Sequence, residues 1–164
     1  MSRGSLTRAV LVLGLAPPVL AAAPELPASD QEAAFKAAGF TRRSEQWRSA
    51  CDDPGTTSYT PGAIEAVGDL DGDGRPEAVI TEGGTYCYGH TGTGFTLVSK
   101  QADGSWKSIY SATGIANFLS TKGAGGWPDI QIGGPGFCFP VVRWDGREYQ
   151  LNRHEYEGKS CRPE

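Results

Sequence analysis

The stretch DLDGDGRPEAVIT, residues 69–81, decides how this chain can be interpreted. Asp69, Asp71 and Asp73 stand at alternate positions, and Gly74 follows directly after them. Glycine suits a sharp turn because it has no Cβ to obstruct a positive φ. The apolar residues that come next favour a β-strand. The pattern therefore predicts an acidic loop that turns tightly and leads into a strand.

The density of acidic residues in this loop predicts a bound cation. Four carboxylates within nine residues repel one another, and a divalent ion removes that repulsion. Ca²⁺ takes six to eight oxygen ligands, and alternating side chains around a turn can supply several of them. The expected Ca²⁺ ligands are the side chains of Asp69, Asp71, Asp73 and Glu77 and the carbonyl oxygen of Arg75. The alternative is an Asp-Gly-rich turn that binds no ion.

The loop differs from an EF-hand and resembles another calcium motif. An EF-hand has a glutamate at loop position twelve and a helix on each side. Position twelve here is Ile80, and the flanking segments AIEAV and EAVIT favour strands. The pattern D-x-D-x-D-G-x-x-E before an apolar strand resembles the calcium loop of integrin-α-type FG-GAP repeats (VCBS-type), over about 13 residues. The resemblance implies Ca²⁺ held by the same five residues. It does not extend to a propeller, which needs at least four blades.

The beginning of the chain predicts an export signal. Two arginines precede a short apolar run, and alanines follow at 21–23. This order is typical of a signal peptide, and the run is too short to cross a bilayer. We expect residues 1–22 to be removed. Residues 23–164 should then form a single domain that is periplasmic or secreted and not embedded in a membrane.

The charge balance disfavours nucleic acid as a partner. The formal net charge is −4, and it becomes 13 − 19 = −6 once the two arginines of residues 1–22 are removed. An acidic protein is not attracted to the phosphate backbone or to an anionic membrane surface. We therefore expect neither nucleic acid nor lipid as a partner.

The four cysteines of the mature chain predict two disulfides. An even number in an exported protein is typical of disulfide bonding, and four cysteines allow three pairings. The favoured pairing joins Cys51 to Cys87 and Cys138 to Cys161. Cys87 and His90 also form a C-x-x-H half-site for zinc. A structural zinc site needs a second close pair, which the sequence lacks.

The segments outside the loop predict an α+β fold. Ser29 or Asp30 can cap a helix through QEAAFKAAGF, residues 31–40, and Gly39 can end it. Asp-Gly pairs in ADGSW and WDGRE predict two hairpins. Strands are expected at 42–48, 62–68, 77–82, 94–99, 105–110, 115–121, 129–132, 137–144 and 147–152. The expected fold is mainly antiparallel β-sheet with one N-terminal helix, stabilised by disulfides.

Two segments of the chain resemble each other. RPEAVITEGGTYCY (75–88) and WPDIQIGGPGFCF (127–139) share a Pro-acid pair, an apolar strand, Gly-Gly and an aromatic-Cys-aromatic triplet. The similarity favours an internal duplication whose second copy lacks the aspartates, with coincidence as the alternative.

In a strand, both rings of an aromatic-Cys-aromatic triplet would share one face. Rings expected in the core are those of Tyr86, Tyr88, Trp106, Trp127, Phe137, Phe139 and Trp144. An exposed platform for a glycan or protein is the alternative.

The sequence contains no recognisable catalytic motif. A G-x-S-x-G elbow is absent, and the glycine-rich stretch GHTGTGFT lacks the Gly-Lys-Ser/Thr ending of a phosphate-binding loop. Two of the acidic residues Glu65, Glu82 and Asp129 could serve as the acids of a glycoside hydrolase, but the sequence does not determine their separation.

We expect an exported calcium-binding module with a structural ion and a protein or glycan partner. A small secreted hydrolase acting on glycan or cell-wall material, or a secreted enzyme inhibitor, is the alternative.

Overall fold

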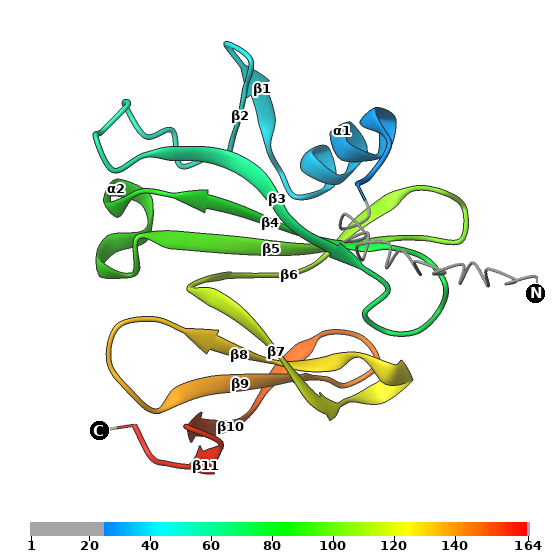
Figure 1. Cartoon of the computed structure of the whole chain (residues 1–164), viewed down its shortest axis with the longest axis vertical. Helices are drawn as coiled ribbons and strands as arrows, with labels where there is room; N and C mark the ends of the chain where they lie inside the picture. Colours follow the sequence, from blue (N-terminus) through cyan, green and yellow to red (C-terminus); the bar gives the residue numbers. More distant parts are fainter. Residues whose placement is uncertain (1–24, 164) are drawn as a thin grey trace, which may run out of the picture.

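The computed structural model describes residues 25–163, so the expected signal peptide lies outside the described residues. These residues form two antiparallel sheets and an N-terminal helix (Figure 1). The first sheet has the strand order β1-β2-β3-β4-β5-β6, and the second has the order β11-β10-β9-β8-β7. The predicted fold class, mainly antiparallel sheet with one N-terminal helix and disulfides, is confirmed.

Turns and loops join the elements along the described chain, and one of the longer loops, residues 49–59, lies between β2 and β3. In order they are α1 (Ala28–Ala37), β1 (Thr41–Arg43), β2 (Gln46–Arg48), β3 (Thr60–Gly68), β4 (Glu77–Gly83), α2 (Thr85–Tyr88), β5 (Thr93–Lys100), β6 (Trp106–Thr113), β7 (Ile115–Lys122), β8 (Pro128–Gly133), β9 (Phe139–Trp144), β10 (Tyr149–Tyr156) and β11 (Lys159–Ser160). Two 3₁₀ turns, η1 (Gly89–Thr91) and η2 (Ala124–Gly126), precede β5 and β8.

The first sheet is buried on both faces at its centre. Ala78 and Ile80 of β4 pack with Phe35 of α1 in one apolar core. Val79, between them in sequence, packs with Ile130 of β8 in a second core between the sheets. Alternate side chains of a strand point to opposite faces, so β4 contributes to both cores. Figure 1 shows α1 beside the first sheet and away from the second. The loop before β4 is therefore attached to the most buried strand of the fold.

The helix starts earlier than the sequence predicted. Its N-cap is Pro27, and no side chain makes a capping hydrogen bond, so the predicted cap at Ser29 or Asp30 is wrong. The Asp30 carboxylate instead accepts hydrogen bonds from Lys100 Nζ at 2.7 Å and from Trp106 Nε1 at 3.2 Å. These contacts attach α1 to the edge of the first sheet. Gly39, with φ of +83°, lies just beyond the end of the helix as expected.

The turns follow the predicted chemistry at two places and differ at a third. The Asp-Gly hairpins join β5 to β6 and β9 to β10, as expected. The strand predicted at 42–48 is wrong as a single element, because it divides into β1 and β2. Ser44 and Glu45 form the turn between them, with φ values of 47° and 66°. Positive φ at both central residues is the geometry of a tight two-residue hairpin.

Neither aromatic-Cys-aromatic triplet forms a continuous strand, and the strand expected at 137–144 begins only at Phe139. Residues 85–88 form the short helix α2, and Cys138 lies before β9 with a φ of 64°. Tyr86 and Phe137 are therefore 62% and 64% exposed, so their predicted place in the core is wrong. Tyr88, Phe139 and Trp144 are partly buried. Trp106 and Trp127 are buried as expected.

The two disulfides have the favoured pairing, Cys51 with Cys87 and Cys138 with Cys161. Disulfides persist in oxidising compartments, so their presence indicates an oxidising environment rather than the reducing cytosol. Within residues 25–163, no helix has the length and apolar character needed to cross a membrane.

Candidate metal centre

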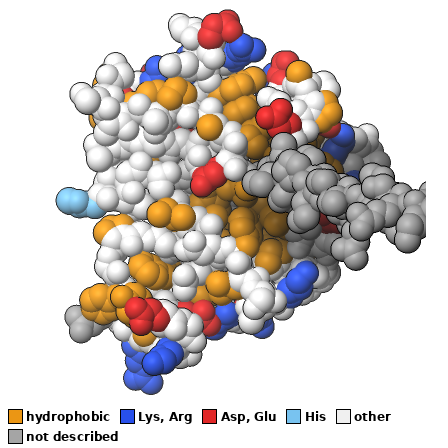
Figure 2. Space-filling view, in the orientation of Figure 1, with side chains coloured by type: hydrophobic (Ala, Val, Ile, Leu, Met, Phe, Trp, Pro, Cys, Tyr) orange, Lys and Arg blue, Asp and Glu red, His pale blue; other side chains and the backbone are white. Residues whose placement is uncertain are grey.

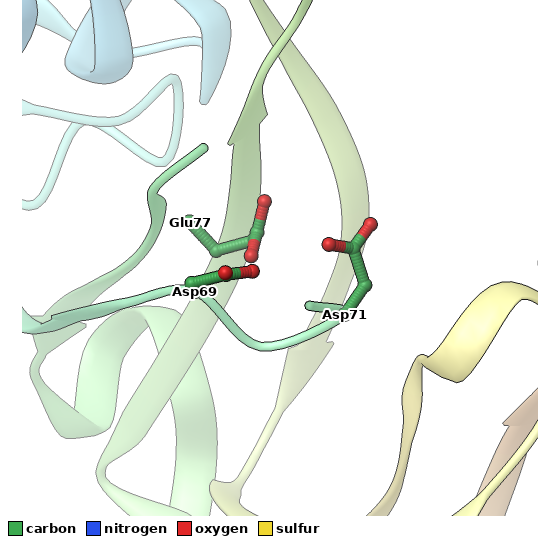
Figure 3. Close-up of side chains that lie close together, drawn as sticks. All are labelled: Asp69, Asp71 and Glu77. Carbon is green, nitrogen blue, oxygen red and sulfur yellow. The ribbon is translucent and has the colours of Figure 1, made fainter. Parts of the chain in front are cut away.

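The loop between β3 and β4 brings three of the predicted ligands together. Asp69, Asp71 and Glu77 each offer a carboxylate oxygen, and the three oxygens lie within 4.8 Å of one another. Figure 3 shows the three carboxylates converging on the same side of the turn. Asp69 is exposed, Asp71 is partly buried and Glu77 is fully buried. The group therefore extends from the surface into the base of the loop.

Local hydrogen bonds shape the turn. The two oxygens of Asp69 accept from the backbone N–H groups of Gly72 and Gly74, at 2.8 and 3.0 Å. Asp71 Oδ1 accepts from the N–H of Asp73 at 3.0 Å. Both glycines have positive φ, near 85°, which other residues rarely adopt. Aspartates that bond to the backbone a few residues ahead are common in tight turns. The loop conformation thus follows from the order of aspartates and glycines.

Glu77 is anchored inside the protein. Its side chain is 0% exposed, and its oxygens accept hydrogen bonds from Leu70 N at 2.7 Å and from Ser99 Oγ at 2.8 Å. Burial raises the pKa of Glu77, and the negative charge of Asp71 raises it further. Burial, with the nearby aspartates, also raises the pKa of Asp71. Negative charge on both Glu77 and Asp71 is therefore unfavourable, and a cation bound between the two carboxylates would offset it.

Asp73 and Arg75 occupy different places from the other predicted ligands. Asp73 Oδ1 accepts from the backbone N–H of Arg75 at 2.8 Å, and its other oxygen pairs with the Arg75 guanidinium. Arg75 Nε also donates to the carbonyl oxygen of Lys100 at 3.0 Å. The Asp73 side chain is thus held by Arg75 and does not join the group of three. The five-residue ligand set stays a prediction.

A second buried carboxylate shows how this fold neutralises such a charge elsewhere. Asp129 follows a proline near the start of β8, as Glu77 follows one at the start of β4, and it is also 0% exposed. Arg143 donates to Asp129 through Nε and Nη2, at 2.9 and 2.8 Å, and Arg153 Nη1 donates at 2.7 Å. These two guanidinium groups, with Thr121, hold the pKa of Asp129 well below its usual range.

Glu77 differs from Asp129 in having only neutral hydrogen-bond donors. Within residues 25–163, a backbone N–H and a serine hydroxyl donate to Glu77, and no lysine or arginine does so. The two positions match in the internal similarity, since each follows a proline at or near the start of an interior strand of its sheet. Two arginines contact the Asp129 carboxylate, whereas two aspartates lie beside the Glu77 carboxylate. A cation at the aspartates would play the part that the arginines play at Asp129.

A third buried carboxylate was not singled out as a centre by the sequence. Glu82 accepts hydrogen bonds from the N–H and hydroxyl of Ser49, from Tyr59 Oη at 2.9 Å and from Tyr88 Oη at 2.8 Å. Burial raises the pKa of Glu82, but the four donors outweigh this and hold it below 4.5. Burial and Glu82 together raise the pKa of Tyr59 to about 12. The donors come from 33, 23 and 6 residues away, so no local pattern could have revealed the cluster.

The possible glycosidase acids do not have the properties of a catalytic pair. Glu65 is exposed on β3. Glu82 and Asp129 are buried, and both have lowered pKa values. The general acid of a glycosidase needs a raised pKa, so that it is protonated near neutral pH. The three acids therefore give no support to the hydrolase alternative.

Comparison with protein families, curated proteins and solved structures finds no match to this chain. The separation of the carboxylate oxygens and their chemistry indicate which ion the site could hold. Two oxygens bound to one Ca²⁺ at about 2.4 Å lie at most about 4.8 Å apart. The separation of the three carboxylate oxygens fits that limit. Carboxylate oxygens, without nitrogen or sulfur, favour a hard ion such as Ca²⁺ over zinc.

Proposed function

We propose that this protein is an exported module that binds Ca²⁺ at the β3–β4 loop and recognises a protein or glycan partner. The buried Glu77 carboxylate, which faces Asp69 and Asp71 and accepts only from neutral donors, carries the metal part of the proposal. A buried carboxylate is costly unless it is paired or bound to a metal. The comparison with Asp129, which has two arginines, supports a cation as the missing positive charge.

The position of the loop supports a structural role for the ion. A Cβ on Gly126 would come within 2.4 Å of the carbonyl oxygen of Asp71, so the loop lies directly against the η2 turn before β8. Leu70, inside the same loop, packs against the core between the two sheets. Ca²⁺ at this loop would hold together a segment that contacts both sheets. It would do so without entering any reaction.

The proposed export and binding role rest on general features of the chain. Two disulfides indicate an oxidising compartment, and the N-terminal residues predict a signal peptide. On the face shown in Figure 2, acidic and basic side chains of the described residues lie interspersed, without a broad basic patch. Such a surface suits a protein or glycan partner better than nucleic acid.

Thermal unfolding in Ca²⁺ and in chelator tests the metal site. At free Ca²⁺ about 100 times the dissociation constant, binding stabilises the folded state by about 2.7 kcal/mol. Asp71→Asn should remove most of that difference. Asp103→Asn is the matched control, because Asp103 lies in the β5–β6 turn, where its carboxylate accepts from Ser105. That variant should respond to Ca²⁺ like the unmodified protein. Identical melting temperatures of the unmodified protein in Ca²⁺ and chelator would contradict the proposal.

A further inference from the structure

A cavity of about 300 Å³ lies on the α1 side of the first sheet, beyond the end of the helix. Its apolar surfaces include Phe40, which follows α1, and Ile80 at the centre of β4. None of the residues that line it belongs to the metal loop. The volume is at the lower end of the range for small-ligand sites, about 300–1,000 Å³. The cavity is therefore a second candidate site, separate from the β3–β4 loop.

Two hydroxyls of the cavity wall are oriented by the buried Glu82. Ser49 Oγ and Tyr88 Oη both donate their protons to Glu82 Oε2. Ser49 Oγ also accepts from the backbone N–H of Cys51 at 3.2 Å. Each of the two hydroxyls still has a lone pair that can accept from a ligand. A Cβ on Gly94 would lie 2.3 Å from the ring of Tyr88, so glycine at this position leaves room for that ring against β5. The wall is thus held in place by packing and by hydrogen bonds.

Strands β5 and β6 contribute a second pair of hydroxyls to the lining of the cavity. Ser111 Oγ donates to Thr96 Oγ1 at 2.9 Å across β5 and β6. The hydroxyl of Thr96 has its own proton to donate, and Ser111 has lone pairs to accept. Thr113 adds a fifth hydroxyl at the exposed end of β6. The cavity therefore combines several hydrogen-bond acceptors and donors with an apolar floor.

No lysine, arginine, histidine, aspartate or glutamate is among the described residues that line the cavity. A cationic amine would need a carboxylate in contact, but both oxygens of Glu82 already accept two hydrogen bonds each. An anionic ligand would need a basic group. A purely apolar ligand would leave the hydroxyls without partners, at a free-energy cost.

We infer that this cavity binds a neutral saccharide unit, either as a free sugar or as the end of a glycan chain. A sugar ring has hydroxyls that donate and accept, and its apolar C–H faces can pack against the partly buried ring of Tyr88 in the cavity wall. The inference rests on the proposed binding role, since it names a glycan as the partner. It does not depend on the metal loop.

Saccharide binding to the full-length mature protein tests the inference. Ligand-observed NMR and calorimetry would use glucose, galactose, mannose, N-acetylglucosamine and their oligomers, with glucosamine and glucuronic acid as the charged counterparts. At least one neutral sugar should bind, and its charged counterparts should bind at least tenfold more weakly. Free sugars and oligomers in the same panel distinguish a monosaccharide site from a chain-end site.

Substitutions on β6 locate the site. Ser111→Ala should weaken saccharide binding about two- to tenfold, the usual effect of losing one hydrogen bond. Ser111→Phe should abolish it by filling the cavity. Ser108→Ala is the matched control, because Ser108 is an exposed serine on the same strand that does not line the cavity. Circular dichroism would verify that each variant is folded.

Three outcomes would overturn the inference: no binding of any neutral sugar, preferential binding of a charged sugar, or binding that a folded Ser111→Phe variant retains. Melting in Ca²⁺ and chelator is measured on the same samples. A protein that responds to Ca²⁺ but binds no saccharide refutes only this inference. A protein that binds saccharide but melts identically in both buffers refutes only the metal site.

Discussion

Glu77→Gln should separate the contribution of the ion from that of the fold. Glutamine has nearly the same shape as glutamate, and its carbonyl oxygen can still accept from Leu70 N. The substitution removes a fully buried charge whose pKa is raised by burial and by Asp71. In chelator the variant should therefore be at least as stable as the unmodified protein. In Ca²⁺ it should be less stable, because the ion loses its most buried carboxylate.

The size of this effect can be estimated from the length of the folded chain. About 140 residues fold, and unfolding entropies of about 2.1 cal/mol/K per residue give about 0.3 kcal/mol/K in total. A stabilisation of about 2.7 kcal/mol, at free Ca²⁺ 100 times the dissociation constant, then raises the melting temperature by about 9 °C. If Glu77→Gln weakens binding about a hundredfold, about 0.4 kcal/mol remains, or about 1 °C.

Scanning calorimetry of both proteins in Ca²⁺ and in chelator would measure the difference. Glu82→Gln is the control, because Glu82 is also buried and lies on the same strand. Its four donors come from the protein, so glutamine should destabilise equally in both buffers. The control shows what the loss of a buried carboxylate does when no ion is involved.

Two results would refute this reasoning about Glu77. If Glu77→Gln keeps the full Ca²⁺ response, the glutamate is not a ligand. If the unmodified protein melts identically in Ca²⁺ and in chelator, no ion is bound and Glu77 is only an internal hydrogen-bond acceptor, like Glu82. In the second case the acidic loop would be a turn whose charge the surrounding solvent screens.

Further predictions concern the second sheet and its contact with the loop. Replacing Cys138 and Cys161 with serine should lower the free energy of unfolding by about 3 kcal/mol, from the entropy of a loop closed across 23 residues, and urea unfolding would measure it. The lowered pKa of Asp129 contributes stability that is present above its ordinary value of 3.8 and is lost as the pH falls below it. The stability gap between the unmodified protein and Asp129→Asn should therefore narrow between pH 5 and pH 2 in thermal melts. Gly126→Ala should lower both stability and Ca²⁺ affinity, because its φ is +84° and its Cβ would meet Asp71 O at 2.4 Å; unchanged calorimetric titrations would show that this contact does not support the loop.

Local patterns in the sequence were sufficient for much of the fold. The Asp-Gly pairs predicted both hairpins, and the apolar runs predicted most strands within a few residues of their ends. The loop turn was also predictable, because Asp69 bonds to backbone groups only three and five residues ahead. The predicted burial of Tyr86 and Phe137 was wrong because alternation places two rings on one face only where the residues form a strand. In the structure, residues 85–88 follow Gly84, whose φ of 146° ends the strand direction.

The short-range features of this protein follow from the order of its residues: the acidic turn, the hairpins and the even number of cysteines. Only the tertiary structure decided which carboxylates are buried and what neutralises each of them. Asp129 meets Arg153 from 24 residues away, and Glu82 meets Ser49 from 33 residues away. Such pairings depend on strand order and register, which arise when distant segments share a core. Hydrogen bonds within a turn need no such partner, and their pattern can be read from the order of residues.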